Sequence, residues 1–237
     1  MKLPLISRWL LIFLIVPLLA QAAGTSPVST RAPNWYDVEL IVFRYTDPSA
    51  GSLETWPLNP GLPDWDSAVP PNPTGSGLPY MQLPPSSFRL TSDWQKLARS
   101  PDYQPLLQVA WTQPAIDRAT ALFVRIGTPP ATLLAVGATT TPVAASSTDA
   151  GTPVYGIARL STTGPYLHFD LDLVYRGSLA KVSIPGTTTA ITSGNTAPQF
   201  QWYQLVQDRR IDAGKLNYFD QPLFGVLVLV TPSKAQQ

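Results

Sequence analysis

Apolar and polar residues alternate along much of this chain, and this alternation predicts β-strands because successive strand side chains point to opposite faces. In residues 166–173, every second side chain is large and apolar, and most of those between are polar. Such a strand packs one face against a core and turns the other to water. The pattern predicts strands at 36–43, 106–113, 121–126 and about 202–211, and a hairpin at 155–175 that turns near Thr163–Gly164.

Two predicted strands are too apolar to have a polar face. They are the second half of 36–43 and nearly all of Leu223–Val230. Apolar runs of this length, without alternation, are typical of strands that are covered on both sides. We therefore expect both strands inside a sheet rather than at its edge.

One helix is predicted between Thr91 and Pro101. Thr91 or Ser92 is suited to cap its first turn, Trp94 and Leu97 share an apolar face, and Pro101 ends it. The strands and this helix together predict an α+β fold, with an antiparallel-dominated sheet of about six or seven strands packed against the helix. A ferredoxin-like core with inserted hairpins is the specific arrangement expected.

Stretches rich in proline and threonine interrupt the predicted strands. Proline cannot donate to a strand ladder, so these stretches are expected to be long loops inserted into one domain. The predicted organisation is a leader at 1–23, a flexible segment at 24–34, a single domain at 35–232 with insertions near 44–90, 127–153 and 183–198, and a tail at 233–237.

The first 23 residues have the layout of a secretory signal peptide. Lys2 and Arg8 precede an apolar run from Trp9 to Ala20, and small residues follow at the cleavage positions. The run is shorter than the roughly 20 residues that a membrane span needs. We therefore expect the leader to be removed and the remaining chain not to span the membrane. The chain has no cysteine, which fits the bacterial periplasm better than a disulfide-rich secreted domain.

Charge and composition argue against several functions. The chain has 16 basic and 15 acidic residues and no basic run, so a nucleic-acid partner is not expected. No cysteine, no G-x-S-x-G elbow and no phosphate-binding glycine loop is present, and His168 is the only histidine. The sequence therefore predicts neither a nucleophilic catalytic set nor a cofactor.

Acidic side chains share a face at two places. His168, Asp170 and Asp172 lie on one face of a predicted strand, which is typical of half a metal site or of a carboxylate pair. No further histidine or cysteine completes a ligand set, so no metal is expected. A solvated strand face is the simpler interpretation, with Arg159 opposite in the hairpin as a charge partner. Asp37 and Glu39 form a second pair.

Basic and aromatic residues supply further candidates for binding. Arg209 and Arg210 are neighbours on a predicted strand and therefore point to opposite faces, so they cannot form one clamp. Four tryptophans near strand ends or in loops are candidates either for contact with a glycan or a protein or for anchoring loops. They are Trp35, Trp56, Trp65 and Trp202.

Several segments, taken in order, carry a family resemblance. They are 35–43 (WYDVELIVF), 103–107 (YQPLL), 110–114 (AWTQP), 166–168 (YLH), Arg209–Arg210 and 218–228 (YFDQPLFGVLV). They resemble the CsiV family, periplasmic peptidoglycan-binding proteins of gammaproteobacteria, and the last segment is the most specific. One position departs from the family pattern, because Gln221 stands where histidine is usual. Glutamine does not titrate near neutral pH, which argues against a pH-sensitive or metal role there.

The resemblance implies a non-enzymatic role in the periplasm. Members of the family look like accessory factors that bind peptidoglycan and assist an LpoA-type outer-membrane lipoprotein. That lipoprotein activates a class A penicillin-binding protein, so the family helps to maintain cell shape. The segments contain polar and aromatic residues suited to sugars and peptide stems, and these either bind ligand or fix strand ends and turns. They are Gln113, His168, Arg210, Tyr218 and Asp220.

Two other functions stay open at this point. The first is a protein-interaction module that does not touch glycan and docks through its aromatic loops. The second is a cell-wall hydrolase that uses Asp170 together with Asp37 or Glu39.

Overall fold

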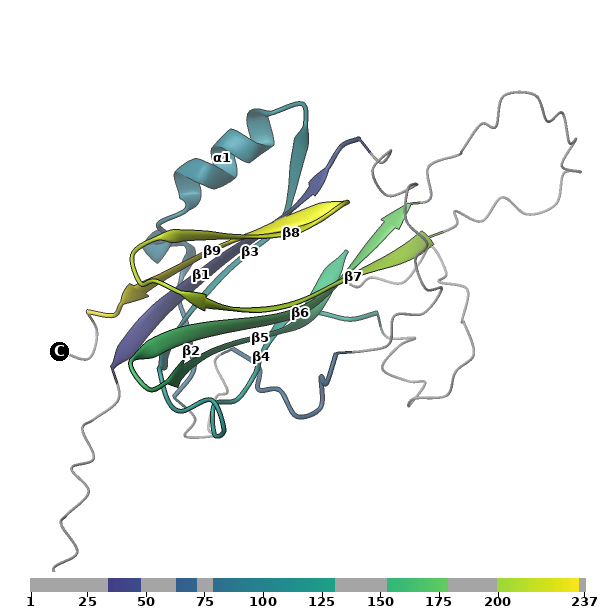
Figure 1. Cartoon of the computed structure of the whole chain (residues 1–237). Helices are drawn as coiled ribbons and strands as arrows, with labels where there is room; N and C mark the ends of the chain where they lie inside the picture. Colours follow the sequence, from purple (N-terminus) through teal and green to yellow (C-terminus); the bar gives the residue numbers. More distant parts are fainter. Residues whose placement is uncertain (1–33, 48–62, 72–78, 131–152, 179–199, 235–237) are drawn as a thin grey trace, which may run out of the picture. The chain divides into compact units, whose positions relative to one another are not determined.

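Regular antiparallel strands make up most of the structure, a computed structural model that describes residues 34–47, 63–71, 79–130, 153–178 and 200–234. The predicted leader, the segment before residue 34, the insertion at 183–198 and Trp56 lie outside these residues. So do parts of the other two insertions. The strands are β1 (Trp35–Tyr45), β2 (Met81–Gln82), β3 (Tyr103–Pro114), β4 (Val124–Gly127), β5 (Val154–Thr163), β6 (Tyr166–Ser178), β7 (Phe200–Ile211), β8 (Leu216–Gln221) and β9 (Phe224–Pro232). With the helix α1 (Thr91–Arg99) and the short 3-10 turn η2 (Pro85–Ser87), they confirm the α+β class (Figure 1).

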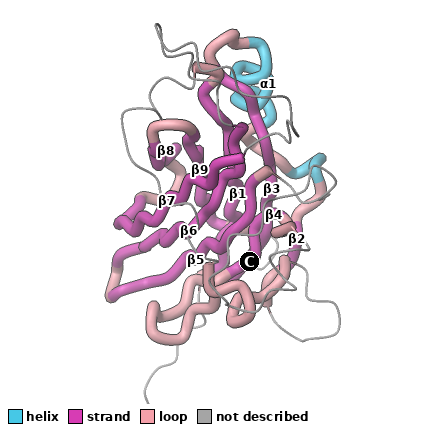
Figure 2. Tube along the Cα trace, turned by 90° about the vertical axis from the view of Figure 1, so that its right-hand side faces the viewer, coloured by secondary structure: helices cyan, strands magenta, loops and turns pink. Residues whose placement is uncertain are grey.

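The strands form two sheets and not the single sheet of six or seven strands that was expected. The first sheet has the order β2-β3-β1-β9-β8 and the second has the order β4-β5-β6-β7 (Figures 1 and 2). All strand pairs within them are antiparallel. Within the described residues there is one α-helix, whereas the expected ferredoxin-like core needs two, so that arrangement is not formed. The predictions for the two most apolar strands are confirmed, since β1 lies between β3 and β9, and β9 lies between β1 and β8.

The division into two sheets follows from where the apolar faces are buried. Val38 and Leu40 of β1 and Leu171 and Leu173 of β6 belong to one core that both sheets line. Rings from the two sheets also meet, with 5.9 Å between the centroids of Phe169 on β6 and Phe219 on β8. Because each sheet has an apolar face, two packed sheets cover both faces at once, which one open sheet with a single helix would not.

Helix α1 is held over the outer face of the first sheet by a carboxylate from β1. Glu39 is buried and accepts hydrogen bonds from the backbone amides of Arg89 at 2.6 Å and Leu90 at 3.0 Å. Gln108 Nε2 donates a third bond at 2.8 Å. The prediction that Thr91 or Ser92 caps the helix is wrong, because the capping position is Leu90 and no side chain of the helix supplies the bond. A negative charge at this end also suits the helix dipole.

The predicted hairpin is confirmed with its turn. Thr163 pairs with Tyr166 across β5 and β6, and Gly164 in the turn has a φ of +57°. This left-handed conformation is the one that glycine adopts without strain. The strand β8, by contrast, was not predicted. Its residues were recognised as part of a motif, and an exposed edge strand of six residues has too little apolar alternation to stand out.

Side chains of β7 cover the outer edge of β8, where the two sheets approach each other. Arg209 NH1 donates to the backbone oxygen of Tyr218 at 3.0 Å, and Gln207 Nε2 donates to that of Asp220 at 3.0 Å. The guanidinium of Arg209 also lies 4.5 Å from the centroid of the Phe219 ring. Carbonyl groups on an edge strand, which would otherwise face solvent, are therefore occupied by the next strand's side chains.

Candidate functional site

Three tyrosines and one carboxylate meet on the outer face of the first sheet. Tyr45 ends β1, Tyr103 begins β3, and Tyr218 and Asp220 share one face of β8. We call these four residues the tyrosine patch. The sheet register brings them together, since Tyr45 pairs with Tyr103 while β1 and β8 flank the same strand, β9.

A glycine beneath the patch lets its rings lie close to the sheet. Gly225 on β9 pairs with Phe43 on one side and with Asp220 on the other. A Cβ atom at this position would lie 2.6 Å from Phe43 Cζ and 2.8 Å from Tyr218 Cε2. Phe43 and Tyr218 therefore stack over the glycine at 6.3 Å between centroids, and Tyr103 meets Phe43 edge-on at 5.4 Å. This packing fixes the rings of the patch in place.

Two tyrosine hydroxyls converge on one oxygen of Asp220. Tyr45 donates to Oδ1 at 2.8 Å and Tyr218 donates to the same atom at 2.6 Å, and the two hydroxyls also contact each other. Burial raises the pKa of Tyr45 to about 12, and the bond to Asp220 acts in the same direction. Burial and the same carboxylate also raise the pKa of Tyr218. Both hydroxyls therefore keep their protons at neutral pH and remain donors to Asp220.

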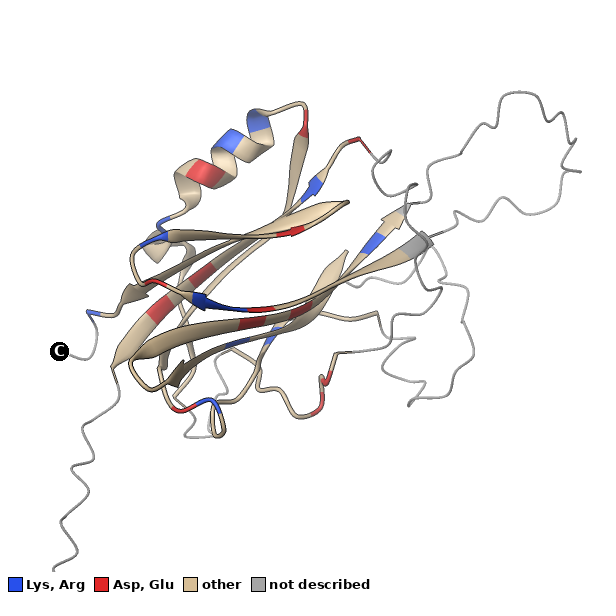
Figure 3. Cartoon of the chain, in the orientation of Figure 1, with Lys and Arg blue, Asp and Glu red and all other residues tan. Residues whose placement is uncertain are grey.

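The patch is accessible and has a negative charge that is not neutralised. Tyr103 is 36% exposed, Tyr218 is 41% exposed, and Asp220 is also exposed. Asp220 is the one charged residue of β8 (Figure 3). Among the described residues it forms no ion pair, and its Oδ2 atom has no hydrogen-bond partner. Aromatic rings beside an unpaired acceptor are suited to binding a polar or cationic ligand.

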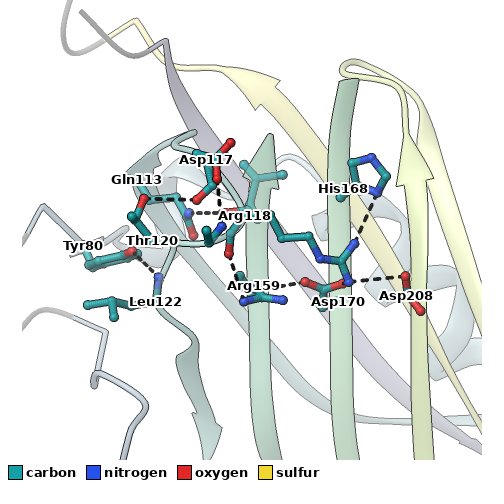
Figure 4. A network of polar contacts seen from close by, with 12 residues as sticks. Tyr80, Gln113, Asp117, Arg118, Thr120, Leu122, Arg159, His168, Asp170 and Asp208 are labelled. Atoms are coloured by element: carbon teal, nitrogen blue, oxygen red, sulfur yellow. Dashed lines mark hydrogen bonds and ion pairs between the residues drawn. The ribbon is translucent and has the colours of Figure 1, made fainter. Parts of the chain in front are cut away.

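A second polar cluster lies on the outer face of the other sheet (Figure 4). Arg118 NH2 contacts Asp170 Oδ1 at 2.6 Å and Asp208 Oδ2 at 3.3 Å, and Arg159 Nε contacts Asp170 Oδ2 at 2.7 Å. We call these four residues the arginine network. Arg159, expected as a charge partner for this strand face, pairs with Asp170, but Asp170 is buried and not solvated as expected. Asp170 is buried and each of its oxygens has a guanidinium partner, so its charge is neutralised within the protein.

The arginine network attaches a loop to the second sheet. Arg118 belongs to the segment between β3 and β4, and its backbone amide donates to Thr162 on β5 at 3.0 Å. Thr162 returns a bond from its own amide to Ile116 at 2.8 Å. The side-chain and backbone contacts together explain the network as a structural link (Figure 4).

His168 and Arg210, two of the predicted site residues, lie together beside this network. They pair directly across β6 and β7. His168 Nδ1 is 3.5 Å from Arg118 NH1, and the Arg210 guanidinium lies 3.5 Å from the centroid of the Tyr166 ring. Arg209 contacts β8 from the opposite face of the strand, as the alternation predicted. His168 and Arg210 lie on a different sheet from Tyr218 and Asp220. The five predicted site residues therefore do not form one site.

Gln113 and Gln221 are buried and form hydrogen bonds inside the fold. Gln113 is fully buried, accepts a bond from Trp111 Nε1 at 2.7 Å and donates to the Leu160 carbonyl of the other sheet at 3.1 Å. Gln221, at the position where the family usually has histidine, is also buried. It accepts a hydrogen bond from the Leu223 amide at 2.8 Å in the turn between β8 and β9, and its Nε2 atom has no partner among the described residues.

The carboxylates considered for hydrolysis point away from one another. Asp37 and Glu39 alternate with core residues of β1, and Asp170 alternates with core residues of β6, so the two sets project from opposite outer faces. Glu39 holds α1 and Asp170 holds two arginines. No cluster of three or more metal-ligating side chains occurs in the described part of the chain.

Sequence reasoning found half of the tyrosine patch. It selected Tyr218 and Asp220 but not Tyr45 and Tyr103, which lie far from them in the sequence. Tyr45 and Tyr218 are 173 positions apart, and only the order β3-β1-β9-β8 brings them into contact. No local spacing could have indicated this, because Tyr45 and Tyr103 lie just outside the strands predicted at 36–43 and 106–113 and within the longer observed β1 and β3.

The class that these features define is a β-rich protein with two packed sheets and a surface suited to binding. The chain belongs to the CsiV family, because the family model described as "Peptidoglycan-binding protein, CsiV" matches residues 10–233, nearly the whole chain. No curated protein and no solved structure shows significant similarity to it. Within the described residues, no helix has the length and apolar character needed to cross a membrane.

Proposed function

We propose that this protein is a periplasmic, non-enzymatic accessory factor that binds peptidoglycan through the tyrosine patch. The observation that carries the proposal is a group of three tyrosines around Asp220, in a member of a peptidoglycan-binding family. Tyr103, Tyr218 and Asp220 are exposed, and Tyr45 is half-buried. Its rings are held by Phe43 and Gly225, so little conformational entropy is lost when a ligand binds.

In addition to binding the wall, the protein is proposed to support cell-wall synthesis. The family resemblance favours help to an LpoA-type outer-membrane lipoprotein that activates a class A penicillin-binding protein. The leader at 1–23 would deliver the chain to the periplasm, where these partners meet the wall. N-terminal sequencing of the protein purified from its native cells should then start just after Ala22 or Ala23. A protein that retains its leader in the cytosol would contradict this location.

Sedimentation with isolated sacculi tests wall binding. The purified protein should pellet with sacculi at low salt, and Tyr218→Ala should weaken the apparent affinity about fivefold, because an aromatic contact of this kind contributes on the order of 1 kcal/mol. Tyr166→Ala is the matched control, since Tyr166 is 44% exposed but lies on the other sheet. Equal loss in both variants would reject the patch, and protein that stays in the supernatant would reject wall binding.

A second measurement separates wall binding from a purely protein-binding role. The same incubation should release no soluble muropeptides, and release by the wild type would contradict a non-enzymatic function. If partner proteins are held partly through the wall, the amount captured from envelope extract should fall after muramidase digestion. Partners that survive digestion while no protein pellets with sacculi would favour the interaction-module alternative.

A further inference from the structure

The tyrosine patch has the chemistry of a receptor for a positively charged group. Asp220 brings a full negative charge, and the described residues place no cation against it. Its Oδ1 atom is fixed by two hydroxyls, while no described residue forms a hydrogen bond with Oδ2. A carboxylate that is held rigidly and left with one open oxygen is ready to accept a hydrogen bond from a charged donor.

The aromatic rings favour the same kind of ligand. The centroids of Tyr45 and Tyr103 are 5.7 Å apart, and each ring also meets Phe43 edge-on, at 5.9 Å and 5.4 Å. Tyrosine rings attract cations electrostatically, and several rings beside a carboxylate recur where proteins bind ammonium groups. The rings and the carboxylate therefore act in the same direction on a cation.

The hydrogen-bonding capacity of the patch argues against a sugar as its main ligand. The hydroxyls of Tyr45 and Tyr218 both donate to Asp220, so their protons are not available to an acetamide oxygen or a sugar hydroxyl. Around Asp220, acceptors are left in excess over donors. A ligand that brings several donors and a positive charge fits this arrangement better than a neutral ring that needs both donors and acceptors.

We infer that the tyrosine patch binds a primary ammonium group, and that in the wall this is the free side-chain amine of the diamino acid in the peptide stems. This inference rests on the proposed function and specifies which part of peptidoglycan the patch recognises. The glycan strands are uncharged apart from their peptides, and the stem carboxylates would be repelled by Asp220. The stem amine is the group whose charge and donors match the patch.

Chemically modified sacculi test the inference. Acetylation of the amines removes their charge, and reductive dimethylation blocks them to a similar extent but keeps the charge. The wild-type protein should bind acetylated sacculi about tenfold more weakly than native sacculi. It should bind dimethylated sacculi with an intermediate affinity, because dimethylation keeps the positive charge but leaves one N–H donor of three. Equal binding to native and acetylated sacculi would overturn the ammonium inference and leave wall binding intact. Failure to bind native sacculi would overturn both.

Two variants check that the effect belongs to Asp220. Asp220→Asn should bind native sacculi about tenfold more weakly and should no longer distinguish them from acetylated sacculi. Asp212→Asn is the matched control, because Asp212 is an exposed carboxylate whose partner is Lys215, and it should behave as wild type. Should Asp220→Asn fold poorly, Tyr103→Leu gives a second reading, since Tyr103 has no bond to Asp220. If a folded Asp220→Asn or Tyr103→Leu variant still binds native sacculi more tightly than acetylated ones, the assignment of ammonium binding to the tyrosine patch is overturned.

Discussion

Asp170 and Asp220 both lie on the outer face of a sheet, but they differ in whether arginine side chains neutralise their charge. Asp170 is buried and held between Arg118 and Arg159, so its charge is neutralised inside the fold. Asp220 is exposed, and within the described part of the chain its donors are two neutral tyrosine hydroxyls. The comparison shows how a structural carboxylate can be told from a candidate binding carboxylate on one surface. The distinction depends on whether the fold itself supplies the countercharge.

The largest effect expected from breaking this comparison is on stability, at Asp170. Asp170→Ala leaves the Arg159 guanidinium without its carboxylate and Arg118 with only the exposed Asp208, and we expect the free energy of unfolding to fall by about 3 kcal/mol. Urea denaturation measures this. Asp208→Ala is the control, since Asp208 is 65% exposed and its loss should cost less than about 0.5 kcal/mol. Similar losses in the two variants would contradict the structural role of Asp170.

A smaller loss of stability, with loss of binding, is expected beneath the tyrosine patch. Gly225→Val places carbon atoms where the Phe43 and Tyr218 rings now lie, within 3 Å of the new Cβ. Overpacking of this kind costs about 1–3 kcal/mol, and it should displace Tyr218 from Asp220. Thermal unfolding and sacculus sedimentation measure the two effects. A variant with wild-type stability and binding would show that the rings do not depend on the glycine.

The tyrosine hydroxyls give a test that does not depend on the ligand. Burial, together with the bond to Asp220, raises the pKa of Tyr45 from 10.0 to about 12. The folded state therefore binds this proton more tightly than the unfolded state. The resulting stability is fully present below pH 10 and is lost as the pH rises toward 12. In an alkaline absorbance titration, Asp220→Asn should lower the ionisation midpoint of this tyrosine, and an unchanged midpoint would argue against the bond.

The smallest effect is expected at Asp172, the second carboxylate of β6 beside Asp170. Burial raises its pKa, while a bond from Gln204 Nε2 at 2.7 Å acts in the opposite direction. Since the folded state holds the proton more tightly, the charged form is penalised as the pH rises through this raised pKa. Asp172→Asn should therefore stabilise the protein at neutral pH by less than about 1 kcal/mol, and the gain should vanish in acid. Urea denaturation at two pH values measures it, and a loss at neutral pH would contradict the burial effect.

Local sequence patterns predicted the parts of this fold that depend on residues close together in the sequence. The turn at Gly164 indicated which strands pair as β5 and β6, and the hairpin made Arg159 a charge partner for the polar face of β6; the register of the structure pairs it with Asp170. The apolar character of β1 and β9 placed them inside a sheet. Contacts between distant segments were beyond such reasoning. The division into two sheets depends on which faces pack together, and Glu39 holds a helix that begins more than 50 positions away.

The site was predictable to the same extent. Tyr218 and Asp220 share a strand and were selected together, whereas Tyr45 and Tyr103 joined them only through the order of strands in the sheet. His168 and Arg210 were grouped with them by their chemistry, but the chain places them on the other sheet beside the arginine network. Residue type indicated which side chains could bind, and topology decided which of them share a surface.

The bonds from Arg209 and Gln207 to the backbone of β8 have a consequence for how copies of this protein behave in a crowded compartment. An edge strand with open carbonyl groups is a template on which a second molecule can add its own strand. Here two of those carbonyls are already engaged by side chains from within the same molecule. The edge beside the tyrosine patch can thus stay accessible to solvent without serving as a template for strand-to-strand aggregation.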